Sequence, residues 1–188
     1  MSAFGWKVLV LGSFPPATYD RKLVPEAERS RAFRAYLTEL HALEVHWIER
    51  FRAKYPAEVL GQLVDQLTTD RLERLALRTI LAHEADGGDW RQARPVGIYA
   101  GNVDAAAKAD SSAYGVGQVV ASTWLGVGDG SPHWTLLHPW YGLRAALAVW
   151  RDAKHGGRSD ANAWNAYAGT PQSGAVRLST FTKLGGIA

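Results

Sequence analysis

Glu84 is the residue whose setting in this chain most suggests chemistry. It lies in line with an apolar stripe, formed by Leu77, Ile80 and Leu81, that repeats at the spacing of one helix face. Apolar neighbours and the negative end of a helix dipole both disfavour a charged carboxylate, so we expect the pKa of Glu84 to be raised. A carboxyl that stays protonated near neutral pH can act as a general acid. The plainer alternative is a helix-end carboxylate packed on Leu81.

The helix that positions Glu84 has start and stop signals in the sequence. Asp70 and Glu73 have the spacing of a capping box, and leucines then recur at helical intervals. Gly87 and Gly88 follow Glu84 and are expected to end the helix. The sequence therefore predicts a helix from about Asp70 that carries Glu84 in its last turn.

Two further regions precede this helix. Residues 1–24 contain a strand-like run from Trp6 to Leu11 and are expected to form an N-terminal arm. Residues 25–68 are expected to form a helical extension or scaffold, with a long helix from Pro25 to about Lys54 and a shorter one from Ala57 to Leu67.

After Trp90 the sequence turns rich in glycine, alanine and aspartate. The runs Val96 to Tyr99 and Tyr114 to Val120 predict a small, irregular β-hairpin. Ser122 is expected to cap a short helix around Thr123 to Leu125.

The last part of the chain returns to helical patterning. Helices are predicted from Pro139 to Lys154, with a stop at Gly156 and Gly157, and from Asp160 to Ala168. The tail, residues 172–188, is poorly patterned, and an edge strand is one interpretation of its alternating Val176, Leu178 and Phe181. The predicted fold class is mainly α, with a small β-hairpin.

Composition restricts the classes of partner. The net charge of +3 comes from 21 basic and 18 acidic residues that are scattered without a basic run, which argues against nucleic acid. No apolar run reaches the ~20 residues that span a bilayer, and the first residues do not match a cleaved signal peptide. The chain has no cysteine, so thiol catalysis is excluded.

Metal and cofactor sites are not predicted. His41 and His46 lie five residues apart, and His133 and His138 lie near Asp129, but neither group has the spacing of a known metal motif. The chain has eight tryptophans. These rings could pack in the core or, since sugars stack on aromatic faces, line a sugar site.

Three segments, in this order, resemble motifs of the lysozyme-like superfamily, in the branch of soluble lytic transglycosylases and goose-type lysozymes. AHEADGGDW is similar to the helix-terminal catalytic glutamate, and AYGVGQVVASTW resembles a G-x-x-Q motif with a threonine-containing turn. AWNAYAG is similar to the A-x-A-Y-N-x-G motif or to the W-x-x-Y-x-x-G of phage and bacterial wall lysins. Residues 69–171 would form the lysozyme-like catalytic core, with the hairpin beside its active-site cleft.

The resemblance implies a role for several side chains. Glu84 takes the place of the catalytic acid, and the expected substrate-binding residues are Gln118, Tyr114, Tyr167, Trp164 and Trp124. The chain departs from the transglycosylase motif in one respect, because Asn165 precedes Tyr167 and Ala168 follows it.

The number of carboxylates in the mechanism is left open. Glycosidases commonly share the work between two carboxylates. The candidates for the second are Asp86, Asp89, Asp104 and Asp110, although Asp86 and Asp89, beside Gly-Gly, are also typical turn formers. If none takes part, the 6-hydroxyl or N-acetyl group of the substrate must attack, and a single glutamate is enough, as the resemblance to transglycosylases implies.

These observations lead to two hypotheses. The first is an enzyme that cleaves the MurNAc–GlcNAc β-1,4 bond of peptidoglycan, as a lytic transglycosylase or muramidase. The resemblance fits a phage-encoded lysin that acts from the virion or at the wall of the target bacterium, delivered without a cleaved signal peptide. The second is a non-catalytic, lysozyme-like structural or wall-binding module of a phage tail, which would contact other tail proteins.

Overall fold

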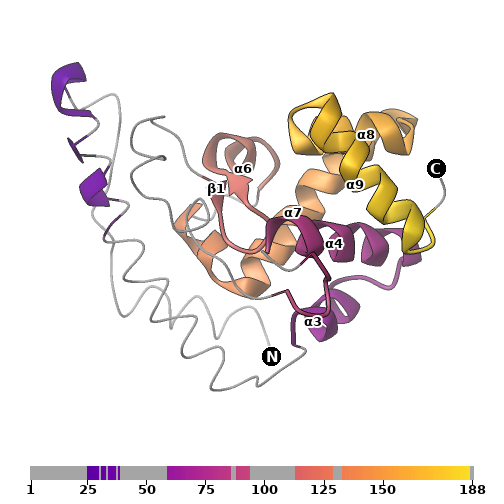
Figure 1. The fold of residues 1–188 in the computed structure, drawn as a ribbon. Helices are drawn as coiled ribbons and strands as arrows, with labels where there is room; N and C mark the ends of the chain where they lie inside the picture. Colours follow the sequence, from indigo (N-terminus) through magenta and orange to yellow (C-terminus); the bar gives the residue numbers. More distant parts are fainter. Residues whose placement is uncertain are drawn as a thin grey trace.

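The protein is mainly helical and carries a small two-stranded antiparallel sheet, as the computed structural model shows (Figure 1). The structure describes residues 25–29, 31–32, 34–36, 38, 59–85, 88–93, 113–128 and 133–186. The mainly α class predicted from the sequence is confirmed. The predictions for the N-terminal arm, for residues 39–58 of the scaffold and for Val96 to Tyr99 lie outside the described residues.

The described part of the scaffold is largely helical. The short 3-10 helix η1 (Glu26–Glu28) begins directly after Pro25, and residues 34–36 are also helical. Tyr36 is buried and belongs to the hydrophobic core, and burial followed by the charge of Tyr114 raises its pKa. Helix α3 (Val59–Leu67) ends at the predicted residue.

Helix α4 (Arg71–Glu84) follows α3 in the chain and packs against it (Figure 1). Its stripe of Leu77, Ile80 and Leu81 is completely buried, because these side chains fall on the face that packs against α3 and the helices that follow. The predicted position of Glu84 at the C-terminal end of this helix is confirmed.

One of the two hydrogen bonds of the predicted capping box at the start of α4 forms, and the other does not. Asp70 Oδ1 accepts a hydrogen bond from the Glu73 amide at 2.9 Å, as expected for an N-cap. The reciprocal bond is replaced, because the Asp70 amide donates to Thr68 Oγ1 at 3.1 Å. The carboxylate of Glu73 instead accepts from Thr68 and from both Nε and Nη2 of Arg151, which ties the start of α4 to the helix that contains Arg151.

A β-hairpin forms within residues 113–120. Strands β1 (Ala113–Tyr114) and β2 (Val119–Val120) pair Ala113 with Val120 and Tyr114 with Val119. Both strands therefore lie in one predicted run, joined by the turn 115–118. Helix α6 (Ala121–Val127) follows at once, and its N-cap is Val120, so Ser122 lies inside the first turn and is not the predicted cap.

Helix α7 (Pro139–Lys154), which follows the 3-10 helix η3 (His133–Leu137), has the predicted bounds. Pro139 occupies the first turn, where a missing N–H costs nothing. The helix ends at η4 (His155–Gly157), where Gly156 and Gly157 have positive φ. His138 is the N-cap residue, and its Nδ1 accepts a hydrogen bond from the Trp140 amide at 3.2 Å.

Because His138 caps α7 and is buried, we expect the folded protein to lose stability in acid. Burial lowers the pKa of His138 from 6.5 to about 4, so the unfolded chain binds this proton at a higher pH than the folded chain. Stability is expected to fall between pH 6.5 and about 4, by at most ~1.4 kcal/mol per pH unit from this group. Urea unfolding of wild type and His138→Asn at pH 7 and pH 5 measures it. Asparagine also caps helices but does not titrate, so an equal acid loss in both proteins would contradict the prediction.

The tail after residue 171 is a helix, which corrects the predicted edge strand. Helices α8 (Asp160–Ala168), at its predicted bounds, and α9 (Pro171–Lys183) pack side by side (Figure 1). Phe181 of α9 is completely buried, because it packs on aromatic rings of α7 and α8. Beyond α9 the chain returns to the start of α4, where Arg71 Nη2 donates to the Gly185 carbonyl at 2.8 Å.

Candidate active site

The carboxylate of Glu84 is held by an arginine from the C-terminal helix. Arg177 of α9 donates from Nε to Glu84 Oε1 at 3.0 Å, and its Nη2 donates to the same oxygen. The side chains are 16% exposed for Glu84 and 15% for Arg177, so the ion pair is largely shielded from water. Glu84 Oε2 has no hydrogen bond within the described part of the chain.

Arg177 is a site residue that sequence reasoning missed, because the tail was interpreted as a strand. Two signals could have found it. Thr170 and Pro171 form a helix start, and the Thr170 hydroxyl accepts from the Ser173 amide at 3.2 Å. Arg177 and Phe181 then lie four residues apart, which puts the guanidinium on the face of α9 that packs against the body of the protein.

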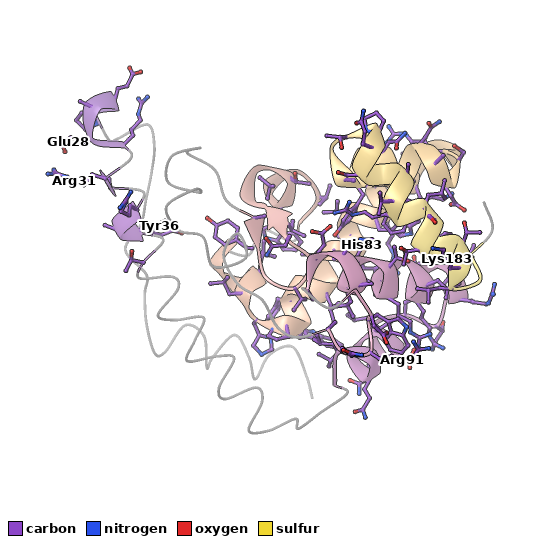
Figure 2. All side chains as sticks on the ribbon, viewed as in Figure 1. Glu28, Arg31, Tyr36, His83, Arg91 and Lys183 are labelled. Carbon is purple, nitrogen blue, oxygen red and sulfur yellow. The ribbon has the colours of Figure 1, made fainter. Side chains whose placement is uncertain are left out.

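His83 lies beside this ion pair, where α4 meets α9 (Figure 2). Its Nε2 is 2.8 Å from Thr180 Oγ1 of α9. Burial, followed by the positive charge of Arg177, lowers the pKa of His83. The ring is therefore neutral at neutral pH, and Arg177 is the charged partner of Glu84.

Tyr167 connects the end of α4 to the hairpin. Its hydroxyl donates to the Gly117 carbonyl at 3.1 Å. Its pKa is raised well above 10, chiefly by burial and then by the negative charge of Glu84. The structure thus brings together the end of α4, the turn 115–118 and α8.

The turn 115–118 lies closely against η3 and α7. Gly115 has φ +68°, and a Cβ there would lie 1.9 Å from the Leu136 carbonyl oxygen, so only glycine fits. Gln118 has φ +45°, which is unusual for a residue with a side chain. Its Nε2 donates to the Gly115 carbonyl at 2.9 Å, so this side chain, which was expected to bind substrate, also stabilises the turn.

The three other aromatic residues predicted to bind substrate are core residues in this structure. Trp164 is completely buried, and Tyr114 and Trp124 are 2% and 4% exposed. Trp164 packs on Trp150 of α7 with the ring centroids 4.4 Å apart. Such rings have no exposed face for a sugar, and their large apolar area instead stabilises the body that carries Glu84.

One of the four candidate second carboxylates lies within the described residues. Asp89 Oδ1 accepts from the Arg91 amide at 3.0 Å and from Arg91 Nη1 at 3.3 Å, the pattern of a turn-forming aspartate. Asp86, Asp104 and Asp110 lie outside the described residues.

A pocket of about 340 Å³ lies away from Glu84. Its described lining comes from α3 and the segment after α4, namely Leu60, Gly61, Gln62, Asp65, Trp90, Arg91 and Ala93. Arg78 and Arg91 both lie over the Trp90 ring, at 4.6 and 4.9 Å from its centroid. Trp90 thus has two arginine partners from the protein itself.

In the described ranges, the structure has no group of three or more metal-ligating side chains that could hold an ion. No described helix combines the length and apolar character that a membrane span requires. Comparison with protein-family models, with curated proteins and with solved structures found no match.

Proposed function

We propose that this protein cleaves the MurNAc–GlcNAc β-1,4 bond of peptidoglycan, with Glu84 as the catalytic acid and then the base. The observation that carries the proposal is the position of Glu84. Glu84 is the last residue of α4, in line with the buried apolar stripe of that helix. Tyr167, which bonds to the turn 115–118, lies near its carboxylate. Oε2 of Glu84 has no hydrogen bond within the described residues. The three sequence motifs that resemble lytic transglycosylases are the ones that meet here.

The proposed mechanism uses one carboxyl group. Protonated at Oε2, Glu84 gives its proton to the glycosidic oxygen as the bond to the anomeric carbon breaks. The 6-hydroxyl of the same sugar attacks that carbon, and Glu84 takes the hydroxyl proton, which yields a 1,6-anhydro end. A single glutamate is favoured over a pair with Asp89, because Arg91 already holds the Asp89 carboxylate.

A non-catalytic wall-binding module is the second proposal, and two observations favour it. Arg177 pairs with Glu84 and stabilises the charged carboxylate, whereas a general acid must carry a proton. Three of the predicted sugar-binding rings are buried. In this proposal the lysozyme-like arrangement is retained without turnover.

Mass spectrometry of digested peptidoglycan distinguishes these proposals. Purified protein is incubated with sacculi over a wide range of enzyme concentrations, and the soluble fragments are analysed. Fragments with 1,6-anhydro ends indicate a transglycosylase, and fragments with reducing ends indicate a hydrolase. No new fragments at any concentration, together with co-sedimentation of the protein with sacculi, would support the wall-binding module.

A further inference from the structure

We propose that Arg177 is the positioning residue of Glu84, fixing Oε1 so that Oε2 is the oxygen that exchanges protons with the substrate. The inference rests on the proposed function and extends it to a residue outside the three motifs. The evidence is that Arg177 bonds to only one oxygen of the Glu84 carboxylate, since Nε and Nη2 both donate to Oε1. A guanidinium usually bonds the two oxygens of a carboxylate in parallel, which would occupy both.

Arg177 can hold this position because its own side chain is fixed. Its Nη1 donates to the Ser173 carbonyl at 3.0 Å, one turn earlier in α9. The side chain is 15% exposed, and α9 packs on both α4 and α8. All three guanidinium nitrogens are therefore bonded, so the Glu84 carboxylate has a rigid partner.

Two titratable side chains, His83 and Tyr167, lie near the ion pair of Glu84 and Arg177. From α4, His83 has a pKa lowered by burial and by Arg177. From α8, Tyr167 has a raised pKa, so its hydroxyl stays protonated and donates to the Gly117 carbonyl. Both side chains are neutral at neutral pH. Replacing Arg177 thus changes the one positive charge among these groups that faces Glu84.

Arg177→Met tests the inference, because methionine keeps much of the aliphatic part of the side chain but removes the guanidinium group and its charge. We expect kcat for cleavage of purified glycan chains to fall ~10- to 100-fold, as in misplacement of a reacting group, with KM within about threefold of wild type. Loss of kcat with KM and the melting temperature kept distinguishes a positioning role from a general loss of structure. Arg177→Lys keeps the charge but has no planar guanidinium, so it should lose a smaller part of kcat than Arg177→Met.

Lys183→Met is the matched control, since Lys183 is an exposed cation of the same helix whose side chain has no hydrogen bond or ion pair with the described residues. It should leave kcat and KM unchanged. Melting temperatures of all variants check the fold, and Arg177→Lys gives the test if Arg177→Met does not fold.

Three results would overturn the inference. In the first, a folded Arg177→Met or Arg177→Lys keeps the wild-type kcat while Glu84→Gln is inactive; the proposed function then stands without a role for Arg177. In the second, kcat rises in Arg177→Met, which makes the ion pair an inhibitory contact. In the third, the wild type releases no fragments, and the proposed function fails together with the inference.

Discussion

Glu84→Gln is expected to lower the rate of glycan cleavage by ~10²- to 10⁴-fold, the usual contribution of a general acid or base. An amide cannot give a proton to the glycosidic oxygen or take one from the attacking hydroxyl. The fold should persist, because the amide oxygen can still accept the N–H groups of Arg177 at the position of Oε1. Release of soluble fragments from sacculi measures the rate, and circular dichroism checks the fold.

Asp89→Asn is the matched control for this prediction. Asp89 is the other described carboxylate considered for catalysis, and its oxygen bonds to Arg91. Asparagine forms the same kind of turn, so the variant should cleave at a rate within about threefold of wild type. Equal rates for Glu84→Gln and wild type would remove Glu84 from the mechanism. A large loss in Asp89→Asn would instead indicate two carboxylates.

Trp164→Ala is expected to cost ~3–5 kcal/mol in the free energy of unfolding, the range for truncating a buried aromatic side chain. Trp164 is completely buried and contacts Trp150 of α7, Phe181 of α9 and Tyr167 of its own helix. Its loss leaves a cavity where three helices meet, close to Tyr167 of the proposed site. Urea unfolding monitored by circular dichroism measures the change.

Two further variants make this measurement specific. Trp164→Phe should cost less than Trp164→Ala, because it keeps an aromatic ring and removes Nε1, a buried donor without a partner among the described residues. Val176→Ala on α9 should change stability by less than ~0.5 kcal/mol, because Val176 is 56% exposed. If Trp164→Ala were as stable as Val176→Ala, the packing of α8 described here would be contradicted.

The elements with strong end signals could be predicted from the sequence. The bounds of α7 and α8 are as predicted, because a proline stands at the first turn of α7 and glycines follow both helices. The position of Glu84 at the end of α4 followed in the same way from the apolar stripe. These are local effects, so a sequence pattern is enough to reveal them.

Helix α9 depends on contacts that the sequence pattern does not show. Gly174, Val176 and Thr180 have low helix propensity, which made the segment look poorly patterned. In the structure Gly174 is needed for packing, since a Cβ there would lie 2.2 Å from Asn165 Oδ1 of α8. The helix is stabilised by that close approach and by burial of Phe181, both of which are tertiary effects.

The roles of the aromatic residues could not be predicted for a related reason. A tryptophan that packs in a core and one that binds a sugar have the same side chain, and only burial separates them. The segment AWNAYAG indicated correctly that this stretch is helical, whereas Trp164 faces the core and Tyr167 bonds to the hairpin turn. The sequence placed these residues in one short helix, but the neighbours of each depend on the tertiary fold.

The hydrogen bond between Arg71 and the Gly185 carbonyl joins the first turn of α4 to the chain just after α9. Helix ends fray, and the last turn of α9 would otherwise be held by its own backbone bonds alone. Because Phe181 lies in this part of α9 and is completely buried, a contact that limits fraying here also keeps water away from the core.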